Sequence, residues 1–113
     1  MDDLTIIARD LDMTSEQEQQ LRHAADEATR IYPADDMRAE REQVVSGAAQ
    51  WITGDSDLTS LSLTLHDARR REAAALDQLR GAIIAAADTG HSEHAITKTT
   101  GLSRTTVRNI LGK

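Results

Sequence analysis

Two short helices joined by a tight turn are predicted by residues 91–113, HSEHAITKTTGLSRTTVRNILGK. The hydroxyl of Ser92 can cap the first helix, because it can accept a hydrogen bond from a free N–H group of the first turn. This helix is expected to run to about Thr100. Gly101 tolerates the positive φ at which a helix can end abruptly. Ser103 can cap the second helix in the same way as Ser92 caps the first.

The second helix is expected to bury its apolar side chains, which are Val107, Ile110 and Leu111. The whole segment resembles the helix-turn-helix of bacterial repressors and resolvase-type recombinases, whose pattern runs roughly I-A-x-x-x-G-V-S-R-x-T-V. The matching residues are Ile96, Thr97, Gly101, Leu102, Ser103, Arg104, Thr106 and Val107. Thr97 stands where the family usually has Ala. The resemblance covers about a fifth of the chain and implies that the last helix, residues 103–112, binds the major groove of double-stranded DNA.

Polar side chains on and near the last helix are of the types that bind DNA, since Arg reads guanine, Asn reads adenine and Thr contacts phosphate or the thymine methyl group. The side chains that we expect to contact DNA are Ser92, Lys98, Ser103, Arg104, Thr105, Thr106, Arg108 and Asn109. We place Thr105, Thr106 and Asn109 nearest the bases. Ser103 and Lys98 suit phosphate, and both arginines suit either role.

The amino-acid composition favours an all-α fold. The chain of 113 residues has no Phe, one Trp, one Tyr and one Pro, whereas strands favour aromatic and β-branched residues. It also has no Cys, which excludes disulfides and thiolate metal sites. The predicted architecture is an N-terminal helical bundle or hairpin followed by a tri-helical helix-turn-helix module.

The net charge of −6 is unevenly distributed. Residues 1–65 contain 5 Arg and 14 Asp or Glu, a net charge of −9, whereas residues 66–113 contain 8 Lys or Arg and 5 Asp or Glu, a net charge of +3. Binding to phosphate requires local positive charge. We therefore predict an acidic region for dimerisation or partner binding at 1–65 and a DNA-binding module at 66–113.

The acidic region is expected to contain three helices. Apolar residues at i, i+3 and i+7 predict the first helix, over residues 2–12, with a strand at Leu4–Ala8 as the alternative. A capping box of Thr14 with Gln17, or of Ser15 with Glu18, can begin the second. The second ends before Pro33, and the third begins at residue 35 or 36 and ends near Gly54.

A long helix is expected from Leu58 to about Asp88, with a bend or break before His66 as the alternative because the serines and threonines there are poor helix formers. Its second half would be the first helix of the DNA-binding module, and its apolar side chains would pack against those of the two helices that follow. These packing residues are Leu79, Ile83 and Ile84 on the long helix, and Ile96, Leu102, Val107 and Ile110 beyond it.

A homodimer is expected, because a single helix-turn-helix covers too few base pairs to select one site. The apolar residues upstream of the module exceed what one small core needs. The predicted interface consists of Trp51, Leu58, Leu61 and Leu65. Trp51 suits a core position as well, since its indole is a large share of the apolar area in a chain with so few aromatic residues.

An enzyme is not predicted, because no nucleophile has a recognisable setting and no glycine-rich phosphate loop is present. No catalytic residue, cofactor or metal site is expected; His91 and His94 lie beside acidic residues but lack further ligands. No apolar run approaches about 18 residues and no basic leader begins the sequence, so a cytoplasmic protein is expected. The alternative function is an antitoxin-like or phage-encoded adaptor whose acidic helices bind a protein partner.

Overall fold

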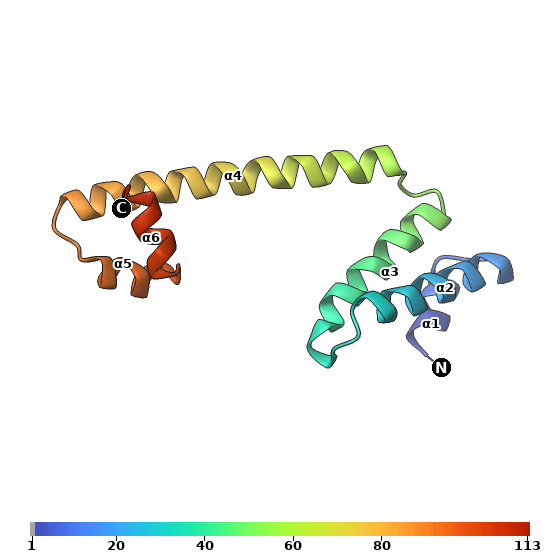
Figure 1. Ribbon diagram of the computed structural model, residues 1–113. Helices are drawn as coiled ribbons and strands as arrows, with labels where there is room; N and C mark the ends of the chain where they lie inside the picture. The colour runs from blue at the N-terminus through green and yellow to red at the C-terminus, as the bar shows by residue number, and fades with distance from the viewer. Residues whose placement is uncertain (1) are drawn as a thin grey trace. The chain divides into compact units, whose positions relative to one another are not determined.

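The structure, a computed structural model, describes residues 2–113 and is all-helical over that range, with no strand (Figure 1). The elements in order are α1 (Asp3–Asp10), α2 (Ser15–Ile31), the 3-10 helix η1 (Asp35–Met37), α3 (Arg38–Ile52), α4 (Leu58–Asp88), α5 (Glu93–Thr100) and α6 (Arg104–Ile110). The predicted all-α class is confirmed. The alternative strand at Leu4–Ala8 is wrong, because these residues lie in α1. Helix α4 is continuous, so the alternative break before His66 is wrong as well.

The described residues form two packing units, which divide between Leu63 and Thr64, within α4. Each unit has its own buried residues, and each is described by itself below. None of the helices in residues 2–113 has the length and apolar character that crossing a membrane requires.

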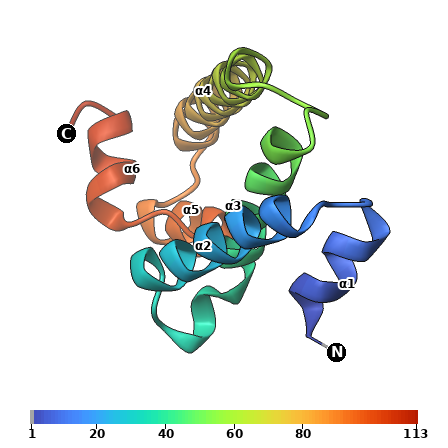
Figure 2. The same ribbon diagram turned by 90° about the vertical axis from the view of Figure 1, so that its right-hand side faces the viewer.

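In the first unit, α2 packs against both α1 and α3 (Figures 1 and 2). The buried residues are Ala8, Leu21, Ala28 and Ala49, so three of the four are alanines. A small side chain at a contact lets two helix backbones approach closely, but it buries little apolar area. The first unit therefore has a thin core, and polar contacts supplement it.

The start of α2 is held by a capping box. The backbone N–H of Gln17 donates to the Thr14 hydroxyl at 3.1 Å, and the N–H of Thr14 donates to the Gln17 side chain at 3.0 Å. The same Gln17 amide donates to the backbone carbonyl of Ile52 at 3.3 Å, which ties the start of α2 to the end of α3. Of the two capping boxes predicted, the one at Thr14 is confirmed.

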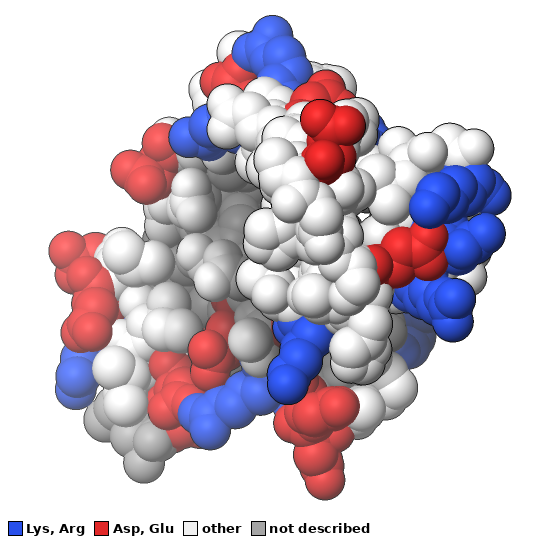
Figure 3. Space-filling view, turned by 90° about the vertical axis from the view of Figure 1, so that its left-hand side faces the viewer, with Lys and Arg blue, Asp and Glu red and all other residues white. Residues whose placement is uncertain are grey.

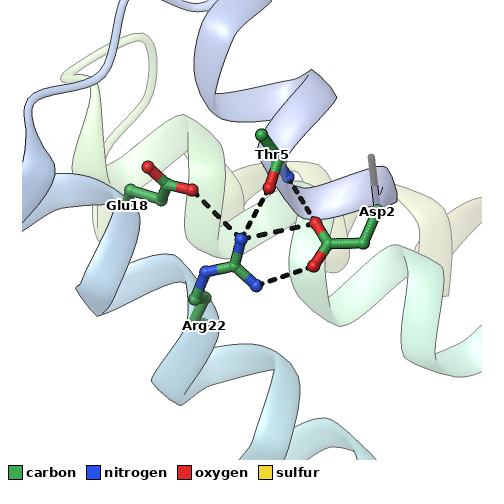
Figure 4. Close-up of polar contacts among 4 residues, drawn as sticks. All are labelled: Asp2, Thr5, Glu18 and Arg22. Atoms are coloured by element: carbon green, nitrogen blue, oxygen red, sulfur yellow. Dashed lines mark hydrogen bonds and ion pairs between the residues drawn. The ribbon is translucent and has the colours of Figure 1, made fainter.

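Arg22 joins α1 to α2 through its guanidinium group (Figure 4). It donates to Asp2 at 3.1 and 3.3 Å, to the Thr5 hydroxyl at 2.7 Å and to Glu18 at 3.1 Å. Asp2 also caps α1 by accepting from the N–H of Thr5 at 2.8 Å. The hydrogen bond from Arg22, with those from Thr5, lowers the pKa of the Asp2 carboxyl well below its ordinary value. This network fixes a helix of eight residues that buries only Ala8.

In the second unit, the core consists of Ile83 on α4, Ile96 on α5 and Val107 on α6. The partly buried residues packed against it are Leu79, Ala86, Ala87, Leu102, Ile110 and Leu111. Three helices thus share one apolar cluster, and most of the packing residues expected from the sequence belong to it. Ile84 does not: it is 53% exposed, because it follows Ile83 on the helix and points about 100° away.

Candidate nucleic-acid interface

The turn between α5 and α6 is built from local hydrogen bonds. Ser92 accepts from the N–H of Ala95 at 3.1 Å and begins α5, and Gly101 ends it with φ of 73°. Ser103 then begins α6 by accepting from the N–H of Thr106 at 3.1 Å. Both serine caps and the left-handed glycine are at the predicted positions.

Helix α6 separates apolar from polar residues. Val107 is fully buried against α4 and α5, whereas the polar residues Arg104, Thr105, Thr106 and Asn109 are exposed. Arg108 is partly buried. One face of α6 therefore anchors the helix, and the other presents guanidinium, hydroxyl and amide groups to solvent.

Several of the predicted DNA-binding side chains already have partners within the protein. Ser92 and Ser103 accept hydrogen bonds as helix caps, and the hydroxyls of Ser103 and Thr106 lie 2.8 Å apart. No hydrogen bond or ion pair engages the side chains of Lys98, Thr105 or Asn109 within the part of the chain that is described. These last three side chains can bind a ligand without breaking a contact.

Glu93, at the start of α5, is surrounded by cations from the C-terminal end of the chain. Arg108 Nη1 lies 3.2 and 3.1 Å from its two carboxylate oxygens, and Lys113 Nζ lies 3.1 Å from Oε1. Arg104 Nε is 3.8 Å from Oε2. Figure 3 shows such a gathering of basic side chains beside an acidic one at the right-hand edge of the face drawn. Two of the predicted DNA-binding arginines therefore share a carboxylate.

The Glu93 side chain is only 19% exposed, so its ion pairs are shielded from solvent more than the other ion pairs of this unit. The hydrogen bond from Lys113, together with the charge and hydrogen bond of Arg108, lowers the pKa of this carboxyl below its ordinary value, although burial opposes the shift. Glu93 is therefore ionised at neutral pH and carries the negative charge with which these cations pair.

Sequence reasoning missed the role of Glu93, which it considered only as a neighbour of His91 and His94. It also assigned no role to Lys113. The opposite charges of Glu93 and Lys113 were the only sign of this ion pair in the sequence. The two residues are 20 positions apart in the chain, so their spacing does not indicate that they are in contact. Among residues 2–113, no group of three His, Asp or Glu side chains is arranged to hold a metal ion.

Thr97 has a hydroxyl that is buried without a hydrogen-bond partner in the protein. This is the position at which the helix-turn-helix pattern usually has Ala. The neighbouring Thr100 hydroxyl, by contrast, donates to the carbonyl of Ile96 at 2.8 Å and accepts from the N–H of Leu102 at 3.2 Å. The departure from the pattern therefore leaves a polar atom in an apolar contact.

The basic run at residues 69–71 lies on the exposed middle of α4. Arg70 pairs with Asp67. Neither Arg69 nor Arg71 has an ion pair within residues 2–113. An exposed basic run of this kind suits a solvated helix face or a phosphate contact that flanks the main interface.

Of the four residues predicted at a dimer interface, Trp51, Leu58 and Leu65 are exposed and Leu61 is partly buried. Trp51 is 57% exposed and Leu58 73%, and both line an apolar groove of about 490 Å³ in the first unit together with Leu61. Trp51 is therefore not a core residue. Gly47 lies in the same groove, and a Cβ atom there would meet nothing within 4 Å. Leu65, in the second unit, is also exposed.

Comparisons with protein-family models, with curated proteins and with solved structures found no match.

Proposed function

We propose that this protein is a small sequence-specific DNA-binding regulator of the repressor type, with α6 as the helix that enters the major groove. One observation carries the proposal: α6 is anchored by the buried Val107 and exposes side chains that read base edges. Thr105 and Asn109 have no partner in the described chain and are the main candidates for base contact. Asn pairs with adenine through two hydrogen bonds, and Thr contacts the thymine methyl group.

Phosphate contacts would come from the cations around α6. Lys98 on α5 is exposed and has no ion pair in the described residues, and Arg104 has only the 3.8 Å approach to Glu93. The net charge of +3 over residues 66–113 supports a phosphate-facing role for this part of the chain. We place the protein in the cytoplasm, where such a regulator would meet DNA.

We propose that the regulator acts as a homodimer on an inverted repeat. The apolar groove lined by Trp51, Leu58 and Leu61 supports an interface in the first unit, because Trp51 and Leu58 are large apolar side chains that are more than half exposed and favourable to bury. Gly47 supports an interface at the same groove. Glycine within a helix costs about 1 kcal/mol of stability relative to Ala, and no residue of the described chain fills the space that the missing side chain leaves. A second copy of the chain could pack closely there.

The test is selection of bound sequences from random DNA, followed by gel shift with the selected site. Replacing Thr105 and Asn109 together by Ala should reduce affinity for the selected site much more than affinity for unrelated DNA. Gln78→Ala, at an exposed position of α4 in the same unit, is the matched control and should change neither. Absence of any selected sequence, with equal binding of all DNA by the wild type, would refute sequence-specific recognition by α6.

The second candidate function is binding of a protein partner by the acidic helices. A groove of about 1140 Å³ in the first unit favours it, with Leu4, Ile7 and Leu11 of α1 and its flank facing Val45 and Ala49 of α3. If the chain binds no DNA at low salt, this groove becomes the leading candidate for its function. Substituting Ile7 by Ser and comparing capture of basic amphipathic peptides would then test it.

A further inference from the structure

Glu93 occupies an unusual place for an acidic residue in a surface that would face a polyanion. It is the partly buried centre of three cations, Arg104, Arg108 and Lys113. Two of the three contacts are hydrogen-bonded ion pairs of 3.1–3.2 Å, which engage these side chains with a group of the same charge as a phosphate. Any phosphate contact by Arg108 or Lys113 must therefore compete with Glu93.

We propose that Glu93 lowers the affinity for DNA of every sequence by competing with DNA phosphates for Arg108 and Lys113. This inference rests on the proposed DNA-binding function. Phosphate contacts contribute to the binding of every DNA sequence, whereas base contacts contribute only to the correct one. An internal carboxylate that occupies two cations removes affinity for all sequences and leaves the base contacts of Thr105 and Asn109 intact. Affinity for every sequence is thereby lowered by the same factor, and the ratio of specific to non-specific affinity is unchanged.

The position of Glu93 supports a competitor that the fold maintains. It begins α5, directly after the Ser92 cap, so its backbone is fixed by the first turn of the helix. Its carboxylate meets Arg108 in the last turn of α6 and Lys113 beyond it. Because α5 and α6 pack on one core through Ile96 and Val107, the carboxylate and the cations stay close in the free protein.

The experiment compares the full-length wild type with Glu93→Gln, which keeps the size of the side chain and removes its charge. Affinity for a selected site and for an unrelated duplex is measured from 50 to 200 mM salt. The salt slope is the slope of the logarithm of the binding constant against the logarithm of the salt concentration. If both cations contact phosphate in the variant, this slope should steepen by about 0.9 for each contact, or about 1.8 in all. Over this fourfold range of salt, the variant should then lose about 12-fold more affinity than the wild type.

Two further variants serve as controls for the loss of charge at Glu93. Glu72→Gln makes the same change at an exposed residue of α4 that has no ion pair in the described chain, and its salt slope should match the wild type. In the double variant Glu93→Gln with Lys113→Gln, the slope should return toward the wild type by about 0.9. In Glu93→Gln, the affinity for both duplexes should rise by a similar factor at 50 mM salt, and the ratio of specific to non-specific affinity should stay unchanged.

The outcomes separate this inference from the proposed function. If the wild type binds DNA and Glu93→Gln binds with an unchanged or shallower salt slope, the inference is overturned. Glu93 then only stabilises the packing of α5 against α6. Thermal unfolding of both proteins shows whether a loss of binding is due to a loss of folding. If neither protein binds DNA at 50 mM salt while both are folded, the DNA-binding function itself fails.

Discussion

Arg108 reaches back across 15 positions to Glu93, and its Nη1 atom lies 3.1–3.2 Å from both carboxylate oxygens. This ion pair links the end of α6 to the start of α5 on the polar side of the two helices. The apolar side is held by Ile96 and Val107. The orientation of the short helix that we propose to enter DNA is therefore held by apolar packing on one side and by ion pairs to Glu93 on the other.

Arg104 and Arg108 should respond differently to truncation. Arg104 is exposed, and its Nε lies 3.8 Å from Glu93, which is too far for a hydrogen bond. Arg104→Ala should therefore leave the unfolding temperature unchanged. It should cost about 1–3 kcal/mol of binding to one sequence if Arg104 reads a base, or reduce the salt slope by about 1 if it contacts phosphate. Arg108→Ala should in addition lower the unfolding temperature, because it removes one of the two hydrogen-bonded partners of a partly buried carboxylate. Thermal unfolding and salt titration of binding distinguish the two.

Removing the hydroxyl of Thr97 should stabilise the protein. Its oxygen is buried without a partner in the protein, and such a group costs about 1–3 kcal/mol of desolvation. Ala also has the higher helix propensity. We expect Thr97→Ala to raise the free energy of unfolding by about 1 kcal/mol, offset in part by the lost methyl contact. Thr99→Ala, at an exposed position of α5, is the control for propensity alone, and an equal gain there would show that the buried hydroxyl has no cost.

Acid should weaken the contacts at Glu93 and Asp2. Both carboxyls have a pKa below the ordinary value, owing chiefly to Lys113 for Glu93 and to Arg22 for Asp2. A group with a lowered pKa in the folded state contributes stability above its unfolded pKa, about 4, and loses it as the pH falls through the folded value. Stability measured by denaturant titration should therefore fall below about pH 4. In Glu93→Gln this fall should be smaller, and an identical pH profile would contradict the assignment.

Removal of Leu58 should weaken self-association if the apolar groove is the dimer interface. Leu58→Gln and Leu63→Gln each replace an exposed leucine at the start of α4, but only Leu58 lines the groove with Trp51. Sedimentation should show a shift toward monomer for Leu58→Gln alone. A dimer with two-fold symmetry would place its recognition helices about 34 Å apart, and the selected DNA should contain an inverted repeat with that spacing or a multiple. A monomer bound to an asymmetric site would contradict the interface.

A fragment from His66 to Lys113 should remain helical and bind DNA weakly. It contains the whole core of Ile83, Ile96 and Val107 and carries the net charge of +3. Fewer than 50 residues bury little apolar area, so a low unfolding temperature is expected. Circular dichroism and gel shift provide the measurement. DNA binding by residues 1–65 in place of this fragment would contradict the division of charge on which the prediction depends.

The sequence alone determined the helical class and most of the helix ends. The capping box at Thr14, the serine caps at Ser92 and Ser103 and the left-handed Gly101 were all predictable, because each depends on groups within a few positions of one another. A hydroxyl three residues before an N–H group reaches it whatever the rest of the chain does. Apolar spacing likewise indicated Ile83, Ile96 and Val107 as packing residues.

Only the tertiary structure decided which side chains are exposed and which cations are paired with a carboxylate. Trp51 is exposed in a unit whose buried residues are mostly alanines, whereas Thr97 has a buried hydroxyl without a hydrogen-bond partner in the protein. The cluster around Glu93 joins residues 11 to 20 positions apart, so it exists only where two helices approach at a particular angle. Local spacing determines the hydrogen bonds at a helix end. A contact between charges that are distant in the sequence depends on how the helices pack. Packing therefore decides which cations remain available to a phosphate.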